Sequence, residues 1–315
     1  MQEDLRSLEG GRTLSERPVE VLRQRIGGAV RGLLTGAEGV DERALAGFAE
    51  PPGDPGLFGP DSVAWRVHGD IAGLIGGLRA LLLQTLHPLA MAGVDQHSDY
   101  REDPWGRLHR TAAFIGATTF GSTATAHEAM AVVRAVHRGV EGTAPDGRPY
   151  SADDPDLLRW VHATEVDSFV QAVAAYGSTR LSGGDIDRYL DEMAVVAEGL
   201  GATAVPRSRA DLRTYWADVR PELEAGPSAR ETARFLLRPP APSWARPAYG
   251  VVTLAAIGLL PAFVRSGLGL PLPPGLDPVV VRPAARSLVR LLGWSLGPSP
   301  LLETARARAT GSPEP

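Results

Sequence analysis

Apolar residues recur at helical spacing along most of this 315-residue chain. Repeats at intervals of three and four residues predict amphipathic helices, and no sustained alternation of apolar and polar residues predicts a strand. The predicted helices cover residues 21–34, 71–86, 108–117, 126–140, 157–175 and 186–200. Pro88, Gly142 and Gly201 stand where three of these helices should end. The pattern therefore predicts an all-α fold.

Stretches rich in proline, glycine and aspartate divide this helical pattern. They cover residues 50–60 and 142–155, and a proline-rich joint covers 238–247. We expect a flexible tail over 1–17, a helical core over 18–240, a C-terminal helical appendage packed on that core over 241–302, and a second flexible tail over 303–315.

One segment, residues 247–264, carries no charge and approaches the length of a membrane span. Gly258 and Pro261 interrupt it, which favours a buried helix over a span. Further on, Arg282, Arg286 and Arg290 recur every four residues near leucines, so contact with a membrane surface stays open as an alternative.

The composition narrows the chemistry. A net charge of −5 and a pI near 5.8 argue against a nucleic-acid partner, because such domains are basic. The absence of cysteine excludes disulfides, zinc–thiolate sites, iron–sulfur clusters and covalently attached haem. The absence of lysine excludes Schiff-base catalysis and a Walker A phosphate loop. The polar N-terminus carries no apolar signal segment, so we expect a cytoplasmic protein.

All seven histidines lie between His68 and His162. Histidine is the commonest metal ligand and titrates near neutral pH, so this half of the chain is where we look for chemistry. A capping-box pattern over 125–128 should start the helix that contains His137. Val133 and Val140 share a helix face with His137, which predicts an inward imidazole well inside that helix.

His162 is a second inward candidate. It shares a helix face with Leu158, Val166 and Phe169, and Glu165 follows one turn later. Either His137 or His162 could instead be an ordinary core histidine that is hydrogen-bonded to the backbone. The sequence alone leaves both readings open.

A third predicted helix lines up Arg107, Arg110, Thr111 and Phe114 on one side. Two guanidinium groups and a hydroxyl that lead to an aromatic ring suit an anion or a polar reaction pocket. The alternative is a solvated face that is salt-bridged to the acidic pair at 102–103.

Two other enzyme classes fail on the sequence. A di-iron bundle needs Glu-x-x-His on two helices, and no glutamate here has a histidine three residues later. The Gly293-x-Ser295-x-Gly297 match to a hydrolase nucleophile elbow has no histidine after the serine and follows a predicted helix instead of a strand.

Four blocks in order form a more specific pattern. They are the segment 77–88 that ends in His87-Pro88, then Arg107-x-x-Arg110-Thr111, Arg134-x-x-His137 and Trp160-Val-His162. Over residues 63–240 the chain resembles the rubber oxygenase (latex clearing protein) and MpaB-type oxygenase family.

The resemblance implies a globin-like helical core with additional N- and C-terminal helices around a non-covalent haem b. It implies His137 as the proximal iron ligand and Arg134 as its accompanying arginine. Arg107, Arg110 and Thr111 match the distal pocket, where they would donate hydrogen bonds to dioxygen or to a haem propionate. His162 matches a family histidine to which we assign no role.

Two departures from the family pattern bear on the substrate. Arg110 stands where rubber-cleaving members have lysine, and Glu141 stands where a further arginine is expected. We therefore expect a haem-dependent oxygenase that acts with dioxygen on an apolar small molecule other than rubber. The alternative is a non-catalytic protein that binds haem or another hydrophobic ligand.

Overall fold

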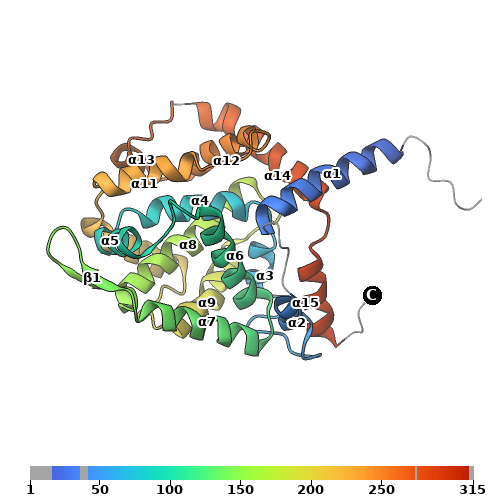
Figure 1. The fold of residues 1–315 in the computed structure, drawn as a ribbon, viewed down its shortest axis with the longest axis horizontal. Coiled ribbons are helices and arrows are strands. Elements are labelled where there is room, and N and C mark those ends of the chain that lie inside the picture. The colour runs from blue at the N-terminus through green and yellow to red at the C-terminus, as the bar shows by residue number, and fades with distance from the viewer. Residues whose placement is uncertain (1–15, 36–41, 274, 312–315) are drawn as a thin grey trace, which may run out of the picture.

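The computed structural model describes residues 16–35, 42–273 and 275–311. Within these ranges helices dominate, and the only sheet is a small antiparallel hairpin (Figure 1). The prediction of an all-α fold is confirmed.

The first half of the chain forms α1 (Glu16–Thr35), α2 (Glu42–Ala49), α3 (Val63–His68), α4 (Gly73–Gln84), α5 (Pro88–His97), α6 (Pro104–Phe120), α7 (Thr123–His137) and the hairpin strands β1 (Glu141–Thr143) and β2 (Pro149–Ser151). The second half forms α8 (Pro155–Tyr176), α9 (Gly183–Leu200), α10 (Arg209–Val219), a 3₁₀ turn (Arg220–Glu222), α11 (Pro227–Leu237), α12 (Arg246–Leu259), α13 (Ala262–Leu268), a π-helical turn (Asp277–Val281), α14 (Arg282–Leu296) and α15 (Pro300–Thr310).

The long helix α8 and the apolar helix α4 pack together at the centre of the molecule (Figure 1). Gly76 permits this close approach, because a Cβ there would lie 3.1 Å from the Cα of Phe169. Arg79 is buried between the helices and pairs with Asp167 at 2.8 Å, and its second amino group donates to the Ser168 hydroxyl at 2.7 Å. This paired charge fixes the register of α4 on α8.

The C-terminal helices share the same core. The Nε of Arg79 donates to the carbonyl of Leu259 at 3.1 Å, which ties α12 to α4. Ala255, Ala256 and Val264 are fully buried in the main apolar cluster. The helix predicted within 247–264 is present as α12, which ends at Leu259, and a second helix, α13, begins at Ala262 directly after Pro261.

Two predicted boundaries are corrected. The helix predicted over 126–140 is α7, which begins one turn earlier because the Ser122 hydroxyl, rather than Thr125, caps it and accepts from the Thr125 amide at 3.3 Å. It ends at His137, since the chain turns at Gly139 and Glu141 already pairs with β2. His137 is thus the last residue of α7 and does not lie well inside it.

The second correction concerns the C-terminus. Residues 303–310, expected in a flexible tail, belong to α15. Ala305 and Arg308 on this helix are buried, and the Arg308 guanidinium donates to backbone carbonyls of the loop and helices around residues 47–54 and 120–121. The hydrophilic sequence of this segment conceals its packing.

No single helix among the described residues has both the length and the apolar content of a membrane span. The pair α4 and α5 reaches that threshold only when joined, and the two helices are bent by 103°.

Candidate functional site

The helices α6 and α7 are consecutive and in contact, and two residues, Gly121 and Ser122, join them. In Figure 1, α6 rises through the middle of the molecule, whereas α7 runs along its lower edge toward the β1–β2 hairpin. Arg107 and His137 each lie about 20 Å along their helices from this turn, at 1.5 Å per residue. We call the turn end, residues 118–130, the closed end, and the two far ends of the helices, residues 107–111 and 133–137, the open end. No hydrogen bond or ion pair joins these two segments among the described residues.

The face of α6 that packs inward changes from buried to exposed along the helix. Thr118 and Thr119 at the closed end are fully buried. Thr111 lies two turns before Thr118 on the same face and is exposed, and Leu108 is 39% exposed although it shares a face with the half-buried Ile115. At the open end Leu108 and Thr111 are therefore exposed, whereas Arg107 is half-buried against Ser98 and Tyr100.

The inward face of α7 shows the same gradient. Ala126 and Met130 are buried, whereas Val133 and His137, which continue the stripe, are half-buried. The prediction that His137 shares a face with Val133 agrees with this geometry. On the flank of the helix, Val136 is 60% exposed.

The His137 imidazole makes no hydrogen bond to any described residue. Burial lowers its pKa, against the opposite effect of the Asp153 carboxylate. The ring is therefore neutral at pH 7, which is the form that ligates a metal. Arg134, one turn earlier, is exposed to solvent.

The predicted polar group of α6 is only partly assembled. Arg107 is half-buried, donates to the Ser98 hydroxyl and lies 6.0 Å from the centre of the Tyr100 ring. The Thr111 hydroxyl donates to the Arg107 carbonyl at 3.0 Å. Arg110 points away and pairs with Asp103 at 3.2 Å with its side chain 68% exposed, so for this residue the salt-bridged alternative holds.

Helix α8 places His162 and Glu165 one turn apart on one face. His162 is only 7% exposed, and its buried Nε2 has no hydrogen-bond partner among the described residues. Burial lowers its pKa to about 4, so this imidazole is neutral as well. It is one of several buried side-chain polar atoms without a hydrogen-bond partner among the described residues.

A buried aromatic group borders Glu165, and the sequence did not predict it. The hydroxyl of Tyr189 in α9 lies 3.1 Å from Nε2 of His68, and the His68 ring packs 4.7 Å from the ring of Phe169. Burial lowers the pKa of His68 to about 4. His68 lies at the end of a six-residue helix, too short to show a periodic signal.

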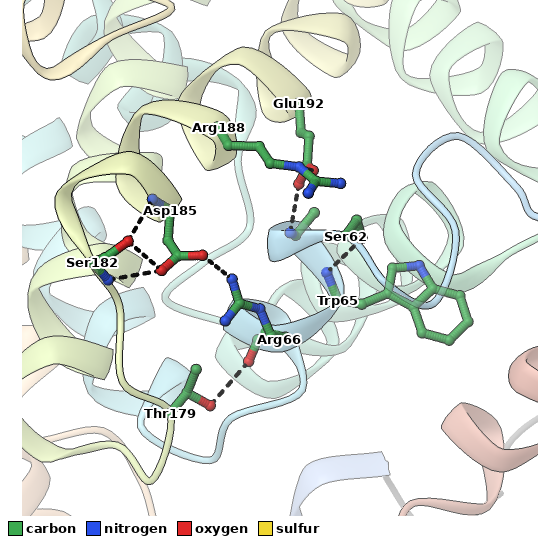
Figure 2. Close-up of polar contacts among 9 residues, drawn as sticks. Ser62, Trp65, Arg66, Thr179, Ser182, Asp185, Arg188 and Glu192 are labelled. Atoms are coloured by element: carbon green, nitrogen blue, oxygen red, sulfur yellow. Dashed lines mark hydrogen bonds and ion pairs between the residues drawn. The ribbon is translucent and has the colours of Figure 1, made fainter.

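Polar contacts fix the α3 helix, which carries His68, against α9. Glu192 of α9 accepts from the backbone amide of Ala64 at 2.8 Å, and Arg66 pairs with Asp185 (Figure 2). Asp185 also completes a capping box with Ser182, where it accepts from the Ser182 backbone amide at 2.8 Å. The position of His68 is therefore set from both helices.

The other histidines have different surroundings. His87 precedes α5, is buried and lies 3.6 Å from Glu222, beside a surface cavity of about 510 Å³. His97 lies 3.1 Å from both the Glu141 carbonyl and the Tyr150 hydroxyl. His127 is exposed in the first turn of α7. Among the described residues no three His, Asp or Glu side chains are grouped to hold a metal ion, so His137 and His162 each stand as single imidazole donors.

Residues 65–294 match the family model described as ER-bound oxygenase mpaB/B′ and rubber oxygenase, catalytic domain. The matched segment covers well over half of the chain and includes all of the candidate residues named above. No curated protein matches the chain, and no solved structure matches it.

Proposed function

Because the chain belongs to the family of MpaB and rubber oxygenase catalytic domains, we propose that it is an oxygenase that binds haem b through His137 and oxidises an apolar small molecule with dioxygen. One observation carries the proposal. Leu108 and Thr111 are exposed on α6 at the open end, and a neutral, half-buried imidazole without a hydrogen-bond partner among the described residues lies on the inward face of α7.

The residues at the open end fit a haem in their chemistry. A porphyrin is a flat apolar disc with two anionic propionates, so it needs apolar walls, one axial donor and cations at its rim. Leu108 and Val133 supply apolar surface, and His137 supplies the donor. Arg107 and Arg134 are the cations that would pair with the propionates.

Each side chain then has a physical role. A bound haem would supply the dioxygen chemistry. His137 would hold the iron, since its low pKa keeps a lone pair available at neutral pH. Contacts with Ser98 and Tyr100 hold the Arg107 guanidinium in place at the open end. The Thr111 hydroxyl is hydrogen-bonded only to the backbone of its own helix.

One observation favours a second function, a protein that binds haem or a hydrophobic ligand without turning over a substrate. Arg110, predicted in the reaction pocket, is engaged by Asp103 and largely exposed. The open end thus has fewer free donors than the resemblance implies, and a fold does not by itself guarantee its chemistry.

The test is the absorption spectrum of the purified, haem-reconstituted protein. We expect a Soret band in the wild type, a loss of haem affinity of about tenfold or more in His137→Ala, and an unchanged band in the matched control His127→Ala, which removes an exposed imidazole from the same helix. Circular dichroism verifies that each variant is folded.

An absent Soret band in the wild type, or an unchanged band in His137→Ala, would contradict the assignment. Dioxygen consumption with apolar substrates then separates the two functions, because only the oxygenase consumes it in proportion to product.

A further inference from the structure

The last helices of the chain expose a group of large apolar side chains to solvent. Val279 and Val280 in the π-helical turn are 72% and 53% exposed, and Leu291 and Trp294 on α14 are exposed as well. Single exposed apolar side chains are ordinary, but a neighbouring group of them marks an interaction site. In Figure 1, α12 and α14 lie in the upper part of the molecule, above α4 and away from α7.

The exposed side chains belong to one continuous helical segment. The π-helical turn ends at Val281, and α14 begins at the next residue. Successive residues of a helix are rotated by about 100°, so Arg290 and Leu291 lie on either side of Trp294 on the exposed side of α14. Arg286 lies one turn before Arg290 on the same side. We call this set the C-terminal face, and it consists of Val279, Val280, Arg286, Arg290, Leu291 and Trp294.

The charge of this region is opposite to that of the rest of the protein. Residues 241–302 contain five arginines and one aspartate, a net charge of +4, whereas the whole chain carries −5, so the remainder carries −9. The one aspartate, Asp277, pairs with Arg282 at 2.7 Å. Arg286 donates to the carbonyl of Ala175, and neither it nor Arg290 has an acidic partner among the described residues. The C-terminal face is therefore both apolar and positively charged.

We propose that the C-terminal face binds the surface of an anionic lipid bilayer. The apolar side chains would enter the boundary between headgroups and acyl chains, a position that favours tryptophan in particular. The arginines would pair with the anionic headgroups. The helix would lie in the plane of the membrane surface, since no single described helix has the length and apolar content of a span. This binding goes beyond the proposed oxygenase and does not depend on it.

The chemistry of the face favours a bilayer over other partners. No acidic residue lies on α14, so a symmetric contact between two copies through this face would bring like charges together. A soluble anionic polymer would pair with the arginines but would leave Val279 and Val280 in water. A bilayer satisfies both kinds of side chain, because its charged layer covers an apolar one.

The experiment is vesicle flotation of the full-length protein. One set of vesicles is phosphatidylcholine alone, and the other contains about 30% phosphatidylserine. Two exposed arginines at about fivefold each predict binding to the anionic vesicles that is more than about tenfold tighter. High salt should weaken this preference, because it screens the headgroup charge.

Variants of the face separate its two parts. Trp294→Ser and Val280→Ser should each weaken binding to the anionic vesicles by about fivefold or more, because less apolar surface enters the boundary region. Arg290→Gln should weaken it by about fivefold. The matched controls are Val132→Ser on α7, where the valine is 58% exposed, and Arg213→Gln on α10, and both should bind like the wild type. Circular dichroism verifies that each variant is folded.

Four results would overturn the inference. They are no flotation of the wild type with anionic vesicles, equal binding to both vesicle types, equal losses in the control variants, and binding that depends on Arg290 but not on Trp294 or Val280. Light scattering tests the alternative of a second copy. A wild-type dimer that Trp294→Ser converts to a monomer would assign the face to self-association instead.

Discussion

The closed and open ends of the α6–α7 pair present the same helix faces in opposite states. At the closed end, Thr118 and Met130 are buried and the turn is bonded to distant segments of the chain. At the open end, Thr111 is exposed and His137 is half-buried without a partner. The inward-facing positions of each helix therefore continue along its whole length in the sequence, whereas the packing that buries them is present only near the turn.

The closed end depends on one buried cation. Arg308 of α15, only 2% exposed, donates to the carbonyls of Phe120 and Gly121 at 2.9 and 3.1 Å. It also donates to the carbonyls of Asp54 and Phe48 at 2.9 and 3.1 Å. The guanidinium thus satisfies carbonyl groups that no regular helix bond reaches.

The largest effect should therefore come from Arg308→Met. The change leaves several buried carbonyls without a donor, and we expect the free energy of unfolding to fall by about 3 kcal/mol or more. Urea denaturation measures it. Arg306→Met, an exposed arginine on the same helix, is the control and should change stability by less than about 0.5 kcal/mol. Equal effects of the two variants would show that the closed end does not depend on this residue.

A packing comparison along α7 should give the next largest difference. Met130 is 4% exposed and packs against Gly199 of α9, so Met130→Ala should lower the free energy of unfolding by about 2–4 kcal/mol. Val133→Ala, one turn further toward the open end, should lower it by about 1 kcal/mol or less, since Val133 is only half-buried. Chemical denaturation of both variants measures the two losses of stability. A larger loss of stability in Val133→Ala than in Met130→Ala would contradict the expected decrease in packing along α7.

Much of this architecture was predictable from periodicity. The helices expected over 71–86, 108–117, 157–175 and 186–200 correspond to α4, α6, α8 and α9, because each carries a long apolar stripe. The role of α15 was not predictable. Arg308 is buried through contacts made more than 180 residues away along the chain, and no local pattern encodes them.

The candidate site could likewise be predicted only in part from the sequence. The inward orientation of His162 followed from its apolar neighbours, and its burial agrees. For Arg110 the sequence left two alternatives open, and the salt bridge to Asp103, the residue that caps the start of α6, is the one that holds. The aromatic group around His68 was also missed, since it is assembled from three helices.

The carboxyl of Glu165 on α8 predicts a pH dependence of the free energy of unfolding, because burial raises its pKa. Its pKa is about 7 in the folded protein, against an ordinary value of 4.5. Between these values the folded chain holds a proton that the unfolded chain has released, so the free energy of unfolding falls as pH rises through this window. The loss at pH 8 relative to pH 4 should be on the order of 2–3 kcal/mol.

Glu165→Gln should remove the part of the pH dependence that comes from this carboxyl, because an amide does not titrate. Contributions from His68 and His162 are common to both proteins and cancel in the comparison. Denaturation of the two proteins at a series of pH values is the measurement. Parallel pH profiles would show that the carboxyl is solvated in the folded state.

The smallest change in stability should come from the open end, and it sharpens the comparison most. Thr111 and Thr118 are one heptad apart on α6, and each hydroxyl donates to the carbonyl four residues earlier, at 3.0 and 2.9 Å. Thr118→Val should lower the free energy of unfolding by about 1 kcal/mol, because its hydroxyl is buried. Thr111→Val should change it by less than about 0.5 kcal/mol, since water replaces the lost bond.

If the open end binds haem, Thr111→Val should nevertheless shift the Soret band or the haem affinity while Thr118→Val leaves both unchanged. If Thr111→Val lowered the free energy of unfolding as much as Thr118→Val, the open end would be packed against other residues. This face of α6 would then not be free to bind a ligand.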